Sequence, residues 1–353
     1  MKLYKSITII FIIWLLTLVF VSYFGFLTLP HSNKFSNDFL ISFSNWDGGH
    51  YLGIAQDGYT EKFQYAFFPL YPLTISLFNN LTGNFLLSAL LVSITSTFLG
   101  LQLLYKLVLA QFDKKLAEKV ILTLLIFPTS YYFLTAYSEG LFFLLVVASF
   151  YFFRSGKLFW ATVFVGLASA TRLAGLALAL GLVVEVMVTY GLGRKNWYIF
   201  LAPLGFLIYC IYLYNKVGDP FYFMVAELHW QRNISLPITS FWETIKSVSQ
   251  AGFINTHINA FLDLIFAVFG LGLSIRTFRF LPISFSLYAL GSVLLPLFTP
   301  TLSSMPRFLL PVFPIFILIA LMKNRYIFSA YQLISIMLLG LFVTLFINGY
   351  WVS

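Results

Sequence analysis

Apolar residues gather in long runs along this chain, and short segments between the runs carry most of the charged residues. Many runs are about 16–25 residues long, which suits helices that cross a bilayer better than the shorter, alternating segments of membrane β-strands. The pattern therefore predicts an all-α, polytopic membrane protein with about eleven membrane-spanning helices. The predicted spans cover residues 7–29, 86–110, 120–135, 139–154, 158–171, 174–190, 196–214, 259–275, 281–298, 307–322 and 326–349.

Composition narrows the class of protein. Of the 353 residues, 60% are hydrophobic and 9% are charged, whereas about 25% of the residues in a soluble domain are charged. So few charges exclude a cytosolic enzyme, a nucleic-acid-binding module and a disordered tail. No segment looks like a separate soluble domain, so residues 1–353 are expected to form a single integral membrane domain.

The basic residues predict the topology. The first apolar run follows Lys2 and Lys5, and it is too long for a signal peptide, so we expect an uncleaved helix whose amino terminus is cytoplasmic. When the spans alternate from there, most Lys and Arg residues fall in short inner loops, as the positive-inside rule requires. The net charge of +9 is then a signal of topology, not of nucleic-acid binding.

Acidic residues and histidines collect on the opposite, outer side of the predicted membrane. Two outer loops are long, at residues 30–85 and 215–258. Long loops in compact proteins are commonly functional. We therefore expect an extracytoplasmic active site, in the cell membrane of a prokaryote or the endoplasmic reticulum of a eukaryote, with membrane lipids around it.

The first outer loop carries the densest group of polar and aromatic residues, NWDGGHYLGIAQDGYTEKFQYAFFPLYP at residues 45–72. Asp47 precedes a predicted short helix of residues 48–56, and His50 follows three positions later on the same helical face. Gly58 suits the carboxyl-terminal cap of this helix. Asp47 could serve only as a helix N-cap, but a carboxylate between Trp and two Gly residues, on the acid-rich side, also suits the abstraction of a hydroxyl proton.

Several segments of the chain resemble the PIG-V family, the second mannosyltransferases of GPI-anchor synthesis and their prokaryotic relatives. The similar segments are WDGGHY at 46–51 with AFFPLYPL at 66–73, FP at 127–128 with AYSE at 136–139, and ATRLAG at 170–175. In the last of these, Leu173 and Ala174 replace the Ser-Asn of the family pattern. This chain therefore lacks the polar side chains of those two family residues.

The resemblance implies a glycosyltransferase of the GT-C type, which takes a sugar from a polyprenyl-phosphate carrier and uses an acid in the first outer loop as catalytic base. Asp47 would be that base, with His50 as a second catalytic candidate and with Trp46 and Tyr59 as substrate contacts. The donor would be polyprenyl (dolichyl) phosphate mannose and the acceptor a hydroxyl of a lipid-linked or surface glycan. The Asp-Gly pair argues against a metal held by two adjacent carboxylates, and no cofactor is expected.

Five other residues are candidates for substrate binding. Glu139 begins a predicted span, where the helix dipole alone would favour a carboxylate. Arg172 and Arg307 lie on the outer side against the general charge bias, and either could bind a donor phosphate or simply extend to the membrane surface. His229 and Trp230, in the second long loop, could line a sugar site, although an amphipathic helix on the membrane explains them slightly better.

Two rival interpretations stay open. One is a transporter or flippase for a lipid-linked sugar, although the odd number of predicted spans and the absence of a convincing repeat do not favour it. The other is the same fold with a different donor sugar, such as arabinose or glucose. No spacing typical of a metal site, a P-loop or a nucleotide-binding glycine loop occurs in the sequence.

Overall fold

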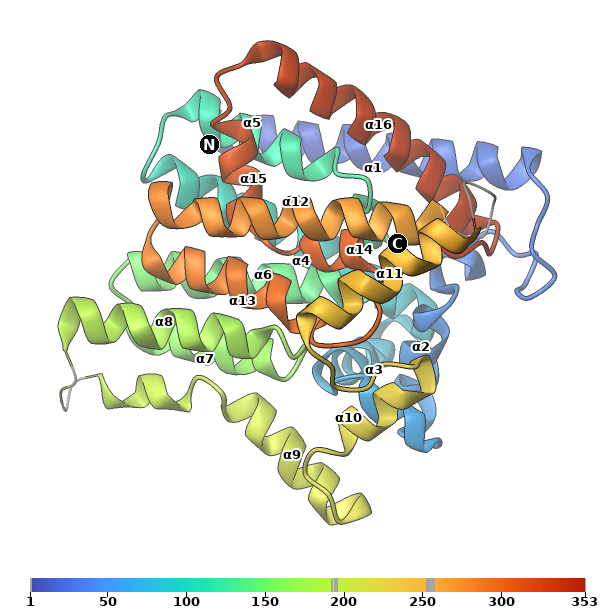
Figure 1. Cartoon of the computed structure of the whole chain (residues 1–353), viewed down its shortest axis with the longest axis horizontal. Coiled ribbons are helices and arrows are strands. Elements are labelled where there is room, and N and C mark those ends of the chain that lie inside the picture. Colours follow the sequence, from blue (N-terminus) through green and yellow to red (C-terminus); the bar gives the residue numbers. More distant parts are fainter. Residues whose placement is uncertain (1, 192, 194–195, 252–257, 353) are drawn as a thin grey trace. The chain divides into compact units, whose positions relative to one another are not determined.

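The computed structural model describes residues 2–191, 193, 196–251 and 258–352, and every regular element within these ranges is a helix (Figure 1). The chain divides into two compact units. The first unit contains Met1–Gly58, Tyr71–Ser155 and Phe316–Val352, and the second contains Tyr59–Leu70 and Gly156–Ile315. The all-α class predicted from the sequence is confirmed for the described residues.

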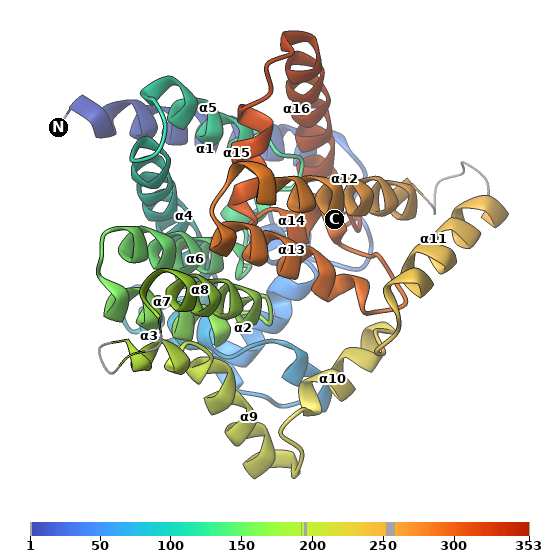
Figure 2. The ribbon, with the colours of Figure 1, turned by 60° about the vertical axis from the view of Figure 1, so that its left-hand side comes forward.

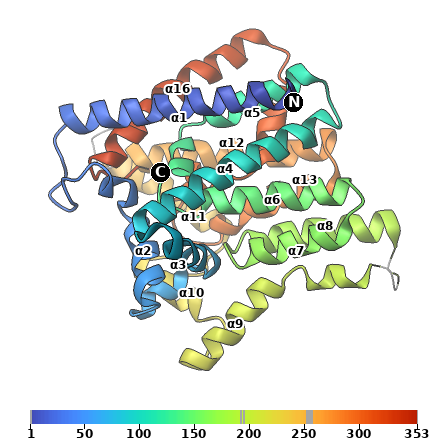
Figure 3. The ribbon, with the colours of Figure 1, turned by 180° about the vertical axis from the view of Figure 1, so that it is seen from behind.

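The first unit is built mainly from long apolar helices. Its helices are α1 (Lys2–Thr28), η1 (Ile41–Ser44), α2 (Asp47–Asp57), α3 (Leu70–Thr82), α4 (Phe85–Leu109), α5 (Lys114–Leu125), η3 (Ser130–Leu134), α6 (Glu139–Arg154), most of α15 (Phe313–Ala320) and α16 (Arg325–Ile347), where η denotes a short 3₁₀ helix. The first and last of them, α1 and α16, pack side by side (Figures 1 and 3). The Asn348 amide donates a hydrogen bond of 3.1 Å to the carbonyl oxygen of Gly25, which fixes the end of α16 to α1.

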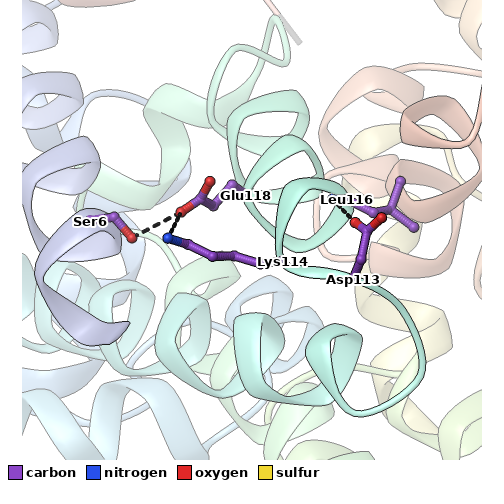
Figure 4. A network of polar contacts seen from close by, with 5 residues as sticks. All are labelled: Ser6, Asp113, Lys114, Leu116 and Glu118. Carbon is purple, nitrogen blue, oxygen red and sulfur yellow. Dashed lines mark hydrogen bonds and ion pairs between the residues drawn. The ribbon is translucent and has the colours of Figure 1, made fainter. Parts of the chain in front are cut away.

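A polar network closes the turn between α4 and α5 (Figure 4). The Asp113 carboxylate accepts a hydrogen bond from the backbone N–H of Leu116 at 2.7 Å and so caps α5. Glu118 then accepts from the Ser6 hydroxyl at 3.2 Å and lies 3.6 Å from the Lys114 ammonium. These contacts join the start of α1 to α5 in a segment that the sequence predicts to be cytoplasmic.

The second unit contains shorter helices and more irregular connections. Its helices are η2 (Lys62–Ala66), α7 (Leu158–Ser169), α8 (Gly175–Tyr190), η4 (Trp197–Leu201), α9 (Leu204–Val217), α10 (Tyr222–Ala226), η5 (Glu227–Trp230), α11 (Pro237–Ala251), α12 (Ile258–Phe280), α13 (Ile283–Leu297) and α14 (Met305–Leu309). Helix α8 packs against both α7 and α13 (Figures 1 and 2). Glu185 on α8 accepts a hydrogen bond of 3.0 Å from the backbone N–H of Ser284 and thereby caps the start of α13.

Three of the predicted spans are interrupted in the structure. The predicted span 120–135 is divided between α5 and η3, 196–214 between η4 and α9, and 307–322 between α14 and α15. A proline lies in each interruption, namely Pro128, Pro203 and Pro311. Proline cannot donate a backbone hydrogen bond, and it disfavours a helical conformation in the residue before it. An apolar run that contains a proline can therefore divide into two helices, even when its hydropathy suits a single span.

Within the described part of the chain, four helices are long and apolar enough to cross a membrane by themselves: Ser6–Thr28, Phe85–Leu109, Ile258–Phe280 and Arg325–Ile347. They agree with four of the predicted spans and support an integral membrane protein. The total of about eleven spans stays a prediction, as does the assignment of each loop to one side. Residues 252–257 of the predicted loop 215–258 lie outside the described residues.

Candidate functional site

Asp47 is the first residue of α2, and its side chain is half-buried. The predicted helix of residues 48–56 is confirmed and extends by one residue at each end. Trp46 occupies the N-cap position with a φ of 60°, and its side chain makes no capping hydrogen bond. The interpretation of Asp47 as the N-cap is therefore wrong, because the carboxylate stands inside the first turn, where the helix dipole favours a negative charge.

The other predicted features of α2 follow from the same turn. His50 lies in the first turn with Asp47 and is half-buried. Gly58 ends the helix with a φ of 76°, and its N–H donates to the carbonyl oxygen of Ile54 at 3.0 Å, as predicted for a C-cap glycine. Gly48 is buried against protein, since a Cβ there would lie 3.3 Å from the Tyr137 ring, whereas Gly49 is exposed. Of the two glycines, only Gly49 is accessible to a substrate.

Hydroxyl groups fix α2 to the start of α6. The Tyr51 hydroxyl lies 3.1 Å from the Ser138 hydroxyl, and both residues are buried. The Tyr137 hydroxyl donates a hydrogen bond of 2.8 Å to the carbonyl oxygen of Asn45, two residues before Asp47. The Asn45 amide in turn donates to the carbonyl oxygen of Phe346 on α16 at 2.9 Å. Contacts on two sides therefore hold the Asp47 backbone in place.

A second chain of hydroxyl groups extends the same cluster into α3 and α4. The Ser93 hydroxyl donates to the carbonyl oxygen of Tyr137 at 3.1 Å and lies 2.8 Å from the Tyr71 hydroxyl. Burial raises the pKa of Tyr71 well above its usual value, and the nearby Tyr51 and Glu139 raise this pKa further. Tyr71 is therefore a neutral hydrogen-bond donor at physiological pH and not a base.

Glu139 is completely buried at the first position of α6. The next residue, Gly140, makes this position possible, because a Cβ there would lie 2.6 Å from the carbonyl oxygen of Ser93. Helices α4 and α6 thus approach closely just where a carboxylate enters the apolar interior. A buried carboxylate requires polar surroundings. Glu139 interacts electrostatically with Tyr71, which belongs to a hydroxyl-lined cluster with Tyr51, Ser93 and Ser138.

The Trp46 ring is enclosed by other aromatic rings. It lies 5.0 Å from the ring of Phe35 and 5.0 Å from that of Trp351. The Lys34 ammonium lies 5.8 Å from the Trp46 ring centroid. Trp351 was not a candidate from the sequence, because nothing in the local pattern relates it to a residue some 300 positions earlier.

Tyr59, His229 and Trp230 belong to the second unit. The Tyr59 hydroxyl donates to the carbonyl oxygen of Phe67 at 2.6 Å, and its ring stacks on that of Tyr65 at 4.9 Å. The structure thus uses Tyr59 for packing. His229 and Trp230 lie in η5, not in an amphipathic helix as the sequence slightly favours; α11 is the amphipathic helix of this loop.

His229 and Trp230 form an aromatic group with two residues of the first predicted loop. The His229 ring is parallel to that of Phe63 at 4.4 Å, and Trp230 meets the edges of Phe63 at 5.7 Å and Phe67 at 5.5 Å. His229 is still exposed, and Trp230 is half-buried. These rings form a partly exposed aromatic surface with an imidazole beside it, and a surface of this kind is suited to packing against a sugar ring.

Arg172 and Arg307 converge on the ring of Phe308, although they are 135 positions apart in the sequence. Their guanidinium carbons each lie 5.7 Å from the Phe308 ring centroid. Arg232, which the sequence did not single out as a binding residue, joins them at 5.2 Å. The three arginines make a compact cationic group, the Phe308 cluster, around one half-buried ring.

The Phe308 cluster has the chemistry of a phosphate-binding site. Guanidinium groups present paired hydrogen-bond donors that match phosphate oxygens. The positive charge of three guanidinium groups also exceeds the negative charge of one neighbouring carboxylate. Asp263 on α12 interacts electrostatically with Arg232, a member of this cluster. Among the described residues, no group of three or more His, Cys, Asp and Glu residues could hold a metal ion.

The comparison with protein families matches the part of the chain that contains Asp47. Residues 26–192 match the family model described as Mannosyltransferase (PIG-V). The predicted resemblance to the PIG-V family is confirmed on this segment, which also includes Glu139 and Arg172 but ends before Arg307. No curated protein matches the chain.

A solved structure shows the same fold at low sequence identity. The chain is similar to ArnT from Cupriavidus metallidurans bound to undecaprenyl phosphate, with a TM-score of 0.55, 19% identity, and coverage of 93% of this chain and 62% of that chain. It also matches ArnT in the apo state, with a TM-score of 0.48, 18% identity, and coverage of 94% of this chain and 62% of that chain. The chain therefore spans about 62% of the length of ArnT, and its predicted GT-C-like architecture is supported at the level of the fold.

Proposed function

We propose that the protein is a membrane-embedded mannosyltransferase that uses polyprenyl (dolichyl) phosphate mannose as donor and a hydroxyl of a lipid-linked or surface glycan as acceptor. The observation that carries the proposal is the PIG-V match across residues 26–192, because it includes the helix start that holds Asp47. The comparison with ArnT bound to undecaprenyl phosphate is consistent with a donor of this lipid class. No nucleic acid and no cofactor take part.

Asp47 is the proposed catalytic base. Its carboxylate accepts the proton of the acceptor hydroxyl while the hydroxyl oxygen attacks the anomeric carbon of the donor. The bond from that carbon to the phosphate oxygen breaks in the same displacement, so the anomeric configuration inverts and polyprenyl phosphate leaves. The half-buried position of Asp47 supports this role, because the carboxylate is accessible while its backbone is held by Asn45 and Tyr51.

His50 and Glu139 are proposed to act beside Asp47. His50 stands in the first turn of α2 with Asp47 and can orient the acceptor hydroxyl or relay its proton. Glu139 is too deeply buried to meet bulk solvent. We propose that it binds substrate hydroxyl groups through the hydroxyl-lined cluster, with Trp46 forming an apolar wall beside Asp47.

The Phe308 cluster is the proposed binding site for the donor phosphate. Arg172 and Arg307 neutralise the negative charge that grows on the leaving phosphate, which lowers the barrier most where water is excluded. Arg307 is 7% exposed, so its charge is poorly screened by solvent. His229 and Trp230 are proposed to contact sugar, and Tyr59 to support that surface from its aromatic packing.

The test is a transfer assay on membranes or purified protein with labelled polyprenyl phosphate mannose and an extract of lipid-linked glycans. We expect Asp47→Asn to lower the rate at least about 100-fold, the usual contribution of general-base catalysis, while the protein remains folded. Asp57→Asn is the matched control, since Asp57 is an exposed acid at the other end of α2. Full transfer by Asp47→Asn would remove Asp47 from its role.

Two further measurements separate the rivals. A panel of polyprenyl phosphates that carry mannose, glucose or arabinose identifies the donor sugar. Movement of a labelled lipid-linked sugar across vesicles, measured without any transfer to an acceptor, would instead indicate a transporter or flippase. For the proposed enzyme we expect mannose transfer and no Asp47-dependent flux.

A further inference from the structure

The turn of Ser303, Ser304 and Met305, directly before α14, is held from two sides. Arg232 donates a hydrogen bond of 3.0 Å from Nη2 to the carbonyl oxygen of Ser303. The backbone N–H of Met305 donates to Asp263 Oδ1 at 3.1 Å, and the N–H of Ser304 also bonds to this carboxylate. A cation from one segment and an acid from α12 therefore grip neighbouring peptide groups of the same turn.

The turn needs this grip because of its backbone conformation. Ser304 has a φ of 71°, in the left-handed region that non-glycine residues avoid. Ser304 is also buried, so its neighbours and not solvent determine whether the conformation persists. Without Asp263, the two N–H groups would lose their buried acceptor, and the turn would relax toward a more ordinary conformation.

The same turn determines where Arg307 stands. Arg307 is the third residue of α14, a helix of only five residues that starts at Met305. Because a helix this short has little stability of its own, its direction depends on the turn that precedes it. Phe308, the ring that all three arginines share, follows next and depends on the turn in the same way.

We propose that Asp263 is a positioning residue for anion binding at the Phe308 cluster: by accepting the N–H groups of Ser304 and Met305, it aims Arg307 at the phosphate of a polyprenyl phosphate. Arg232 is both the opposing half of the grip and a third positive charge of the site. The inference rests on the proposed function for the identity of the lipid and concerns residues that the sequence did not assign to binding.

A carboxylate beside a phosphate site needs a reason, because its charge opposes the ligand. The geometry supplies one, because the Asp263 carboxylate accepts hydrogen bonds from backbone N–H groups and interacts electrostatically with Arg232. Arg172 and Arg307 add two more positive charges to the cluster. Asp263 and the three arginines together carry a positive net charge. Asp263 also lies within α12, one of the four helices able to span a membrane, where an acid is costly unless it has a task.

The experiment measures binding of undecaprenyl phosphate to purified protein in nanodiscs, with undecaprenol as the ligand that lacks phosphate. We expect Asp263→Ala to weaken binding of the phosphate at least about tenfold and to leave binding of the alcohol unchanged. Asp263→Asn keeps an oxygen acceptor of the same reach, so its affinity for the phosphate should stay within about threefold of wild type. These figures correspond to the loss or retention of hydrogen bonds to a buried turn.

A double-mutant cycle separates positioning from general damage. If Asp263 acts through Arg307, Asp263→Ala should cause no further loss of phosphate affinity in an Arg307→Ala background. Glu185→Ala is the matched control, because Glu185 is also a buried acid of the second unit that accepts a backbone N–H. It should lower the thermal stability but leave the affinity for undecaprenyl phosphate unchanged.

Three results would overturn the inference: wild-type affinity in folded Asp263→Ala, equal losses from Asp263→Ala with and without Arg307, or a loss beyond tenfold in folded Asp263→Asn. The last result keeps the test decisive even if Asp263→Ala does not fold, because it would assign the effect to charge and not to the hydrogen bonds. Binding is measured without sugar transfer. A protein that binds the phosphate as described but transfers no mannose would refute the proposed function and leave this inference intact.

Discussion

The hydroxyl groups of Tyr51 and Ser138 lie 3.1 Å apart in the interior of the first unit. Tyr51 belongs to the helix that begins with Asp47, and Ser138 immediately precedes Glu139. One hydrogen bond therefore joins α2, which begins with Asp47, to the residue directly before Glu139 at the start of α6.

Tyr51→Phe removes this hydrogen bond without changing the shape of the ring. We expect a loss of about 1 kcal/mol in the free energy of unfolding, typical of one buried hydrogen bond, and a lower rate of mannose transfer with little change in the KM for donor. Thermal unfolding and initial-rate kinetics test both effects. Tyr23→Phe is the control, since Tyr23 is 51% exposed on α1; an equal loss of rate in both variants would contradict the prediction.

Gly140→Ala tests the close approach of α4 and α6. The added methyl group would lie 2.6 Å from the carbonyl oxygen of Ser93, so the helices must separate and Glu139 must shift. We expect a cost of about 1–3 kcal/mol in stability and a large loss of transfer. Gly272→Ala on α12 places its methyl group in open space, so it should stabilise its helix by up to about 1 kcal/mol; if the two variants behaved alike, the packing argument would fail.

Arg172→Lys and Arg307→Lys test the phosphate site. Lysine keeps the charge but loses the paired donors that match phosphate oxygens, so we expect the KM for the polyprenyl donor to rise about tenfold in each variant, as for the loss of a charge-assisted hydrogen bond. Kinetics at varied donor concentration give the values. Arg279→Lys, at the far end of α12 beside Phe280, should leave the KM unchanged; a rise there of the same size would argue against a specific site.

The raised pKa of Tyr71 predicts a pH dependence of stability. Burial makes the folded protein hold the phenol proton more tightly than the unfolded chain does. The resulting stabilisation is complete below the usual tyrosine pKa near 10 and is lost as the pH rises above that value. Unfolding temperatures of wild type and Tyr71→Phe, compared from pH 8 to 11, should show the advantage of wild type shrinking only in the upper part of the range; a constant difference would contradict this explanation.

Local sequence signals predicted the features that depend on neighbouring residues. The short helix at Asp47 and its C-cap Gly58 follow from glycine and aspartate preferences within a dozen residues, and the structure confirms both. The long apolar helices were equally predictable, because hydropathy and length suffice to identify them; they are α1, α4, α12 and α16.

Features that depend on distant residues escaped prediction. Hydropathy alone gave no reason to divide the segment around Pro311, since the residues directly before and after this proline are apolar. Arg172 and Arg307 were singled out one by one, but only the fold brings them to the same ring as Arg232. The roles of Ser93 and Asp263 likewise require the partner helix to be known, because neither lies in a recognisable motif.

The bond between Gly25 and Asn348 has a consequence for synthesis of the protein. The two residues are 323 positions apart, so at a translation rate of 5–20 residues per second the first helix waits roughly half a minute for its last neighbour. During that interval lipid, or a component of the insertion machinery, must cover the surface that α16 finally occupies. Loss of α16 would therefore leave α1 in the bilayer without the helix that packs against it.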